Sequence, residues 1–208
     1  GGIEPARTLI MRAISSGKSV VTANKAVIAR HGEEIANAAA AAGVYVLIEA
    51  AVGGGIPIIE PLKQSLGGNQ IKRVSGIING TTNYILSRMA QEKIAFEEVL
   101  KDAQELGFAE ANPAADVEGL DAADKIAILS GLAFGGSINR ADIPTKGIAN
   151  LQSKDVDYAK ELGYVVKLLA VAESIQIKNN SNGKLPVSIQ VQPTLIPVDH
   201  PLAGVNGV

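Results

Sequence analysis

The chain has 208 residues, a formal net charge of −2, 3% aromatic residues and no cysteine. Its length allows one substantial core or two small domains. The balanced charge and the scarcity of aromatic rings argue against a nucleic-acid partner. The absence of cysteine excludes disulfides, thiolate metal ligands and a thiol nucleophile.

Neither the histidines nor the apolar segments indicate a metal site or a membrane span. His31 and His200 lie far apart in the sequence, which is unlike a histidine-based metal site. The N-terminus lacks the plan of a signal peptide. The longest apolar tract, residues 38–59, contains Glu49, three consecutive glycines and Pro57, which all disfavour a spanning helix. We therefore predict a soluble, cytoplasmic protein with no membrane partner.

The N-terminal part of the chain has the pattern of a β-α-β unit. Apolar residues at helical spacing predict a helix over residues 3–16 that stops at Gly17. Strands are predicted for KSVVT, residues 18–22, and VYVLIEA, residues 44–50, with an alanine-rich helix over residues 26–42 between them. The continuous apolar run of the second strand is typical of a parallel sheet, with a right-handed crossover.

Two short segments follow these strands, TANK at residues 22–25 and EAAVGGG at residues 49–55. Ligands gather at the carboxyl ends of parallel strands, so Lys25 and Glu49 are candidates for a site. The alternatives are a solvated lysine at a helix start and a capped, buried glutamate.

The glycine-rich segment VGGGIP matches neither common phosphate-binding pattern. Glycines let backbone carbonyls approach each other, so Glu49 with nearby carbonyls is a candidate site for a small cation. A plain tight turn is the alternative. Pro57 then predicts the start of a helix that runs to Leu66.

The middle of the chain is expected to alternate between strand, turn and helix. Residues 71–79 predict a strand, and GTTN, residues 80–83, predicts a turn into a helix over residues 84–91. The start of that helix can bind an anionic ligand, with a simple threonine cap as the alternative. An amphipathic helix over residues 96–106 is closed by Gly107.

The carboxylate-rich segment that follows, residues 106–125, is where we place the chemistry. Asp121 sits where a helix N-cap belongs, and Lys125 lies four residues on, so both share one helix face. Helical side chains lean toward the N-terminus, which carries the amine back over the loop that contains Glu110. These three groups can converge on a small polar molecule. The alternative is a capped surface helix with an ordinary ion pair.

The central helix is expected to end near residues 135–136. A helix is then predicted over residues 153–163, followed by two long strands over residues 165–177 and 187–196, with a turn at residues 179–183 between the strands. Ser153 is the expected helix cap, and the composition NNSNG indicates the turn. Pro193 places the second strand at a sheet edge or a bulge. These strands pair across subunits or form an internal hairpin.

Four segments, VVTANK, EAAVGGGIPII, GIINGTTNYIL and GFAEANPAADVEGLDAADK, occur in this order over nearly the whole chain. In their wording and spacing they closely resemble the homoserine dehydrogenase family. The resemblance implies reversible oxidation of L-homoserine to L-aspartate 4-semialdehyde with NADP or NAD, in threonine, isoleucine and methionine biosynthesis. It also implies an α/β fold, in which an α+β catalytic domain, a mixed sheet covered by helices, follows the end of a Rossmann-type domain.

The resemblance implies a role for each matching residue. Lys125 matches the lysine proposed as proton donor or acceptor, with Lys25 as the rival proton carrier. Glu110 and Asp121 match the carboxylates that bind homoserine, whose ammonium group suits acidic partners.

The remaining matches concern the substrate loop, the cofactor and a metal ion. Gly80 and Thr81 match the loop that faces substrate and nicotinamide, and Lys25 and Gly107 match positions at the cofactor. The family's sodium site is matched by Glu49 and the backbone carbonyls of Val52, Gly54 and Ile56.

The resemblance also implies domain boundaries: the end of the nucleotide domain at residues 1–52, the catalytic domain at 53–170, and strands that form a homodimer at 171–208. The family's glycine-rich dinucleotide fingerprint is absent, so we expect a fragment of a longer chain. A catalytically inactive module that binds substrate and dimerises is the alternative. A different semialdehyde dehydrogenase would need a cysteine, which the chain lacks. The residue that selects NAD or NADP is expected before Gly1.

Overall fold

A computed structural model describes residues 2–175 and 186–207 of the chain. Its contacts divide the chain into two compact units. Unit 1 comprises Gly1–Val74, Asp124–Ile143 and Ala172–Ile189, and unit 2 comprises Ser75–Ala123, Pro144–Val171 and Gln190–Val208. The predicted turn at residues 179–183 lies outside the described residues, as do residues 176–177 of the strand predicted before it.

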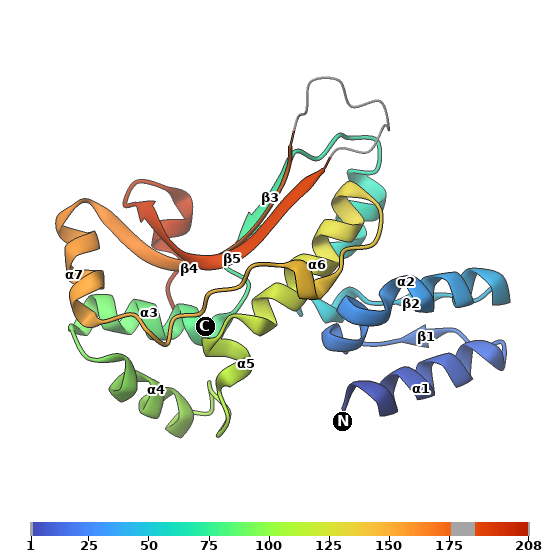
Figure 1. The fold of residues 1–208 in the computed structure, drawn as a ribbon, viewed down its shortest axis with the longest axis horizontal. Helices are drawn as coiled ribbons and strands as arrows, with labels where there is room; N and C mark the ends of the chain where they lie inside the picture. Colours follow the sequence, from blue (N-terminus) through green and yellow to red (C-terminus); the bar gives the residue numbers. More distant parts are fainter. Residues whose placement is uncertain (1, 176–185, 208) are drawn as a thin grey trace. The chain divides into compact units, whose positions relative to one another are not determined.

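Unit 1 opens with the predicted β-α-β pattern (Figure 1). Helix α1 (Ile3–Ser15) precedes strand β1 (Val20–Val21), and helix α2 (Lys25–Ala42) connects β1 to strand β2 (Val46–Leu47). The two strands are parallel, and their paired residues are Val20 with Val46 and Val21 with Leu47. This confirms the expected parallel pairing, although each strand is shorter than predicted.

Helix α2 begins and ends where its sequence indicates. The Asn24 side chain accepts a hydrogen bond from the Val27 amide at 3.2 Å, as an N-cap does. Gly43 ends the helix with φ of 65°, a left-handed conformation that glycine adopts without strain. α1 packs against α2, and the buried side chains of these helices include Ile14 and Ile35.

The helix predicted to begin at Pro57 begins later. Helical structure starts at Ile59 and continues as the π-helical turn η2 (Pro61–Ser65). The reason lies in the short 3-10 turn η1 (Glu49–Ala51), because the Glu49 carboxylate accepts the backbone N–H groups that open this helix. Unit 1 also contains most of α6 (Leu120–Phe134) and the 3-10 turn η3 (Arg140–Asp142).

Unit 2 is built around α3 (Gly80–Glu92), which packs against α4 (Phe96–Glu105), α5 (Ala114–Val117) and α7 (Ser153–Glu161). The segment GTTN is the first turn of α3 rather than a separate turn ahead of it, because Asn79 caps the helix. In α7 the cap is Gln152 instead of Ser153. The Ser153 hydroxyl instead donates to the Ile94 carbonyl at 3.1 Å.

The strands β3 (Arg73–Gly76), β4 (Tyr164–Ser174) and β5 (Val187–Pro197) form a sheet in the order β3-β4-β5, and each strand has residues in both units. β5, which contains Pro193, ends this order, as predicted for an edge strand. Its Val191 also forms a parallel bridge with Thr145. The short 3-10 turn η4 (Pro201–Gly204) places Ala203 in an apolar cluster with Leu169 and Ile196. The mixed α/β architecture predicted from the sequence is confirmed.

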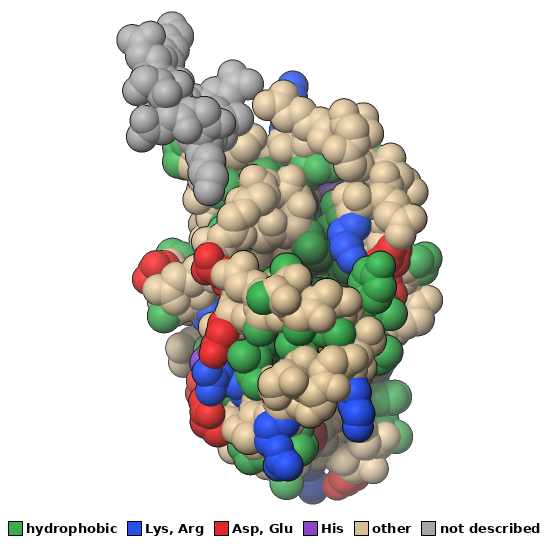
Figure 2. Space-filling view, turned by 90° about the vertical axis from the view of Figure 1, so that its right-hand side faces the viewer, with side chains coloured by type: hydrophobic (Ala, Val, Ile, Leu, Met, Phe, Trp, Pro, Cys, Tyr) green, Lys and Arg blue, Asp and Glu red, His purple; other side chains and the backbone are tan. Residues whose placement is uncertain are grey.

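Two further observations concern the helices and the surface. Among residues 2–175 and 186–207, no helix has the length and apolar character needed to cross a membrane. Figure 2 shows basic and acidic side chains interspersed on the face that it presents, so this face has no extended patch of one sign. Such a patch is the usual footprint of nucleic-acid binding.

Candidate active site

The predicted site residues are divided between the two units. Unit 1 holds Lys25, Glu49, Val52, Gly54, Ile56 and Lys125, whereas unit 2 holds Gly80, Thr81, Gly107, Glu110 and Asp121. We describe the geometry around each group within its own unit.

Asp121 is a buried carboxylate that a neutral amide holds in place. Its side chain is 8% exposed, and its Oδ2 atom accepts a hydrogen bond from Asn79 Nδ2 at 3.0 Å. The same nitrogen donates to Asp116 Oδ1 at 2.6 Å, so one amide group bridges two carboxylates. Asn79 therefore fixes the orientation of Asp121 without adding positive charge.

Asn79 is a candidate site residue that our sequence analysis missed. Its Oδ1 atom accepts from the Thr82 backbone amide at 2.8 Å and from the Thr82 hydroxyl at 2.8 Å, which caps α3. The available signal was an asparagine directly before the helix of the GIINGTTNYIL segment, because asparagine is a favoured N-cap. The amide nitrogen of the Asn79 side chain donates the hydrogen bonds to the two carboxylates.

The loop that faces α3 is tied down by Thr81. The Thr81 hydroxyl donates to the Phe108 carbonyl at 2.7 Å, and the rings of Tyr84 and Phe108 lie 5.0 Å apart. Gly107, just before Phe108, has φ of 77°, which glycine alone adopts readily. Thr81 and Gly107, predicted to serve substrate and cofactor, are thus held on one side of unit 2.

Lys125 lies in α6, four residues after Asp121. α6 begins at Leu120, so Asp121 belongs to the first helical turn and is not the N-cap that we predicted. The spacing of four still places Asp121 and Lys125 on one face of the helix. Lys125 is half-buried, and Ile126 behind it is 1% exposed, so the amine projects from an apolar helix.

Glu110 lies on an exposed loop of unit 2 between α4 and α5. This loop is held through its backbone, because Gln104 Nε2 donates to the carbonyls of Glu110 at 3.0 Å and Ala111 at 3.3 Å. The loop position fits a carboxylate that can meet a ligand from solution.

Lys25 is the first residue of α2 and is half-buried. It follows β1, and the parallel partner β2 is followed by Glu49, so both groups stand after the carboxyl ends of parallel strands. That edge is where nucleotide ligands bind in open α/β sheets. The local arrangement therefore fits a nicotinamide cofactor near Lys25.

Glu49 acts as a cap for the backbone. Its Oε1 atom accepts the N–H groups of Ile58 at 3.0 Å and Ile59 at 3.1 Å, and its Oε2 atom accepts that of Glu60 at 2.9 Å. Glu49 is thus capped, as in the alternative of a capped, buried glutamate, but its side chain is only half-buried. In the described part of the chain, no group of three or more acidic or histidine side chains is arranged to hold a metal ion.

A second buried charge in unit 2 gave no clear sequence signal. Lys167 of β4 is 2% exposed, and its Nζ atom donates to Asn83 Oδ1 at 3.0 Å, Ser87 Oγ at 3.3 Å and Asn206 Oδ1 at 3.2 Å. It also donates to the Val205 carbonyl at 2.5 Å. Burial lowers the pKa of Lys167. This lysine ties α3, β4 and the C-terminal segment together.

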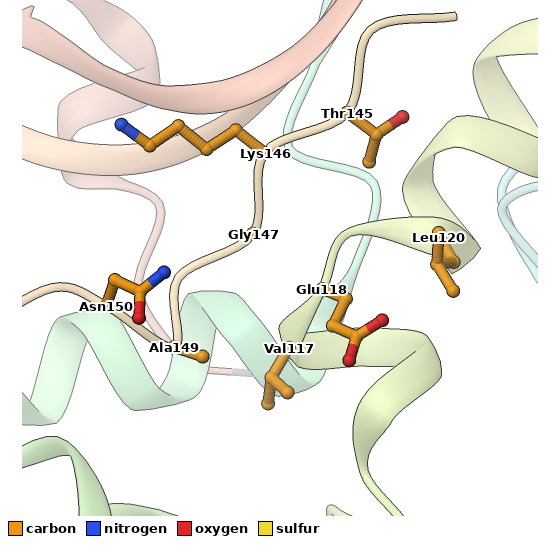
Figure 3. Close-up of a pocket in the computed structure, with 8 residues that line it drawn as sticks. All are labelled: Val117, Glu118, Leu120, Thr145, Lys146, Gly147, Ala149 and Asn150. Carbon is orange, nitrogen blue, oxygen red and sulfur yellow. The ribbon is translucent and has the colours of Figure 1, made fainter.

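Unit 2 contains a pocket of about 330 Å³. Figure 3 shows an extended segment passing the junction of α5 and α6, and the pocket is lined by Val117, Glu118, Leu120, Thr145, Lys146, Gly147, Ala149 and Asn150. The Ile148 amide donates to the Val117 carbonyl at 2.7 Å. None of these lining residues is a predicted site residue, so we assign the pocket no part in the reaction.

Comparison with known proteins places these features in one family. Residues 57–208 match the family model of homoserine dehydrogenase, and residues 1–49 match the model of the homoserine dehydrogenase NAD binding domain. A homoserine dehydrogenase of Synechocystis sp. is 61% identical over 208 residues, which are 100% of this chain and 47% of that protein.

Solved structures agree with these matches. A crystal structure of a homoserine dehydrogenase from Thiobacillus denitrificans has a TM-score of 0.93 at 51% identity, covering 100% of this chain and 46% of that one. A hyperthermophilic archaeal homoserine dehydrogenase mutant in complex with NADPH has a TM-score of 0.79 at 30% identity, covering 98% of this chain and 56% of that one. The chain spans about half the length of the curated relatives that it matches. It belongs to the homoserine dehydrogenase family.

Proposed function

We propose that the protein containing this chain is an oxidoreductase that interconverts L-homoserine and L-aspartate 4-semialdehyde with NADP or NAD. The observation that carries the proposal is the start of α6, where Asp121 is buried and oriented by Asn79 and Lys125 follows one turn later. The identity of the chain to homoserine dehydrogenases over its full length favours this enzyme over an inactive binding module. The solved relative in complex with NADPH supports a nicotinamide cofactor.

Substrate binding follows from charge. Homoserine carries an ammonium group, and Asp121 and Glu110 supply carboxylates that form charge-assisted hydrogen bonds with such a group. Gly80 and Thr81, at the start of α3, provide the adjoining backbone and hydroxyl. Since the Thr81 hydroxyl donates to Phe108, its oxygen can still accept a hydrogen bond from a ligand.

The reaction needs one proton carrier in addition to the cofactor. A bound nicotinamide would supply the acceptor for the hydride that leaves the alcohol carbon of the substrate. Lys125 takes the proton from the hydroxyl oxygen as the carbonyl forms, and returns it to that oxygen in the reverse direction. Lys25, at the start of α2 and beside the proposed cofactor position with Gly107, is the rival carrier.

We also propose a sodium ion as a cofactor of the protein. Oxygen donors suit a hard cation, and the carbonyls of Val52, Gly54 and Ile56 lie in the loop that follows Glu49. The carboxylate of Glu49 already accepts three N–H groups, which leaves about one of its roughly four acceptor positions. The carbonyls would therefore supply most of the coordination.

We further propose a cytoplasmic homodimer that forms through the strands of residues 171–208 and serves threonine, isoleucine and methionine biosynthesis. Residues 1–52 would complete the nucleotide domain and residues 53–170 the catalytic domain. The family membership of the chain supports these assignments.

The acid–base role of Lys125 is tested by the substitution Lys125→Ala in the full-length enzyme. We expect turnover of homoserine with NADP to fall about 100-fold or more, as loss of a general acid–base group does. Lys101→Ala, on the exposed face of α4, is the matched control and should keep wild-type turnover. A Lys125→Ala enzyme with near wild-type kcat would transfer the role to Lys25.

A further inference from the structure

We propose that Arg30, Asp124 and Arg140 form a positioning clamp that holds helix α2 and helix α6 in register for the reaction. These residues do not contact the substrate in our mechanism, and their role rests on the proposed function. They all lie in unit 1, so the contacts belong to one compact body.

The clamp is centred on a buried carboxylate. Asp124 is 6% exposed, its Oδ1 atom accepts from Arg140 Nε at 2.8 Å, and its Oδ2 atom accepts from Arg30 Nη1 at 3.1 Å. Each carboxylate oxygen therefore binds a different guanidinium group. The Arg140 side chain is 11% exposed and that of Arg30 is 37% exposed, so water screens the first contact less than the second.

The three side chains connect parts of the chain that are far apart in sequence. Arg30 lies in α2, 94 residues before Asp124, and Arg140 lies in η3, 16 residues after it. The Arg30 Nη1 atom also donates to the Ala26 carbonyl at 3.0 Å, which fastens the guanidinium to the first turn of its own helix.

Each end of the clamp is next to a proposed catalytic lysine. Ala26 directly follows Lys25, and Asp124 directly precedes Lys125. A hydrogen-bonded chain thus runs from the backbone beside Lys25, through Arg30, to the backbone beside Lys125. It joins the segment that matches the NAD binding domain to the segment that matches the catalytic domain.

Net stabilisation alone is a poor account of this arrangement. Burying guanidinium groups and a carboxylate costs solvation that their attraction only partly returns. Fixed geometry is what the arrangement supplies, because Arg30 ties α2 to one oxygen of the Asp124 carboxylate of α6 while Arg140 of η3 holds the other oxygen. A displacement of about 1 Å at a reacting centre can cost about 100-fold in rate.

This role predicts a specific kinetic signature. Cofactor and homoserine each bind to their own part of the enzyme, so loss of the clamp should leave the two affinities nearly unchanged. The chemical step needs both parts in alignment, so that step alone should slow. An interaction made only in the transition state lowers kcat without a matching rise in KM.

The experiment uses the full-length enzyme with Arg30→Gln as the main substitution, because Arg30 is the most exposed member and its loss should permit folding. We expect kcat for homoserine oxidation to fall about tenfold or more, while the Kd of NADPH and the KM of homoserine change less than about threefold. The primary deuterium isotope effect on kcat should rise as the hydride step becomes rate-limiting. Arg30→Lys, which keeps the charge, should restore part of kcat.

The matched control is Glu34→Gln, which removes an exposed carboxylate of α2, the helix of Arg30, that pairs with Arg7 of α1. Hydrogen exchange of the α6 amides supplies a readout that needs no turnover. Exchange in the first two turns of α6 should quicken several-fold in Arg30→Gln and stay at the wild-type rate in Glu34→Gln.

Three results would separate the possible failures. Unchanged α6 exchange in Arg30→Gln would overturn the physical link, and quickened exchange with wild-type kcat and isotope effect would overturn its role in positioning. A wild-type enzyme that does not oxidise homoserine would instead refute the proposed function, while the exchange measurement would still decide whether α2 and α6 are linked.

Discussion

The bridge that Asn79 makes between Asp116 and Asp121 yields the sharpest test of the proposed substrate site. The substitution Asn79→Asp is nearly isosteric and keeps the oxygen that caps α3 through Thr82. It replaces the amide nitrogen, which donates at 2.6 and 3.0 Å, with a second carboxylate oxygen. Three carboxylates would then meet in a site where Asn79 is now 6% exposed.

The expected loss of folding free energy is estimated from the lost hydrogen bonds, the added repulsion and the cost of binding a proton. Two hydrogen bonds to charged acceptors are lost, each worth about 1.5–3 kcal/mol net. Repulsion between carboxylates at about 4 Å adds about 4 kcal/mol per pair at an effective dielectric constant of about 20. The folded protein can escape this by binding one proton, which for a carboxyl of ordinary pKa costs about 4 kcal/mol at pH 7. The protonated carboxyl can donate to only one neighbour, so one hydrogen bond stays lost and we expect a loss of about 5 kcal/mol or more at pH 7.

The same reasoning fixes the pH dependence. The folded variant binds a proton that its unfolded chain releases, so its free energy of unfolding should fall as pH rises from about 4 to 7, by up to about 1.4 kcal/mol per pH unit. The KM for homoserine should rise about tenfold at pH 7, which corresponds to 1.4 kcal/mol of lost binding, because Asp121 is displaced.

Urea denaturation and steady-state kinetics of the full-length enzyme at pH 5, 6 and 7 would measure both effects. Asn37→Asp, which adds the same charge at an exposed position of α2, is the control. If Asn79→Asp matched this control in stability and in KM at pH 7, the bridge would have no role in holding Asp121 for the substrate.

Three further predictions follow from single residues. Because burial lowers the pKa of Lys167, the folded protein binds fewer protons than the unfolded chain between that pKa and about 10.4. The free energy of unfolding of the wild type, relative to that of Lys167→Met, should therefore increase as pH rises through this window. A difference in urea midpoint that stays constant with pH would contradict this. A Cβ atom on Gly147 would overlap neighbouring backbone, so Gly147→Ala should lose about 3 kcal/mol or more in urea denaturation, whereas Gly68→Ala, with open space around it, should stay within about 0.5 kcal/mol. Glu110→Gln should leave stability unchanged and raise the KM for homoserine about tenfold, and an unchanged KM would place the ammonium elsewhere.

Local structure was the most predictable part of the fold. The helices over residues 3–16, 26–42 and 96–106 and the two C-terminal strands follow from hydrophobic period and from glycines such as Gly43, which the structure confirms as a left-handed helix end. The errors fell at helix starts, at Pro57, Gly80, Asp121 and Ser153. For the helix after Pro57 the cap is a distant side chain, that of Glu49, whereas α3 and α7 are capped by the residue directly before the helix.

The polar contacts of the site were far less predictable. Asn79 meets Asp116 and Asp121 across 37 and 42 residues, and Arg30 meets Asp124 across 94. Such contacts leave no periodic pattern and no local compositional signal in the sequence, because they depend on how whole helices and strands pack. Family resemblance supplied Lys125, Glu110 and Asp121 but not the residues that hold them.

The two aspartates beside Lys125 show why the holding residues matter for function. Asp124 binds two guanidinium groups, so positive charge already balances it and its role is to fix helices. Asp121 accepts a hydrogen bond from the neutral amide of Asn79, which orients its carboxylate without adding a positive charge. An arginine beside a carboxylate weakens the attraction of that carboxylate for a substrate ammonium, whereas an amide does so much less. This difference supports our proposal that Asp121 binds the substrate and that Asp124 aligns the helices.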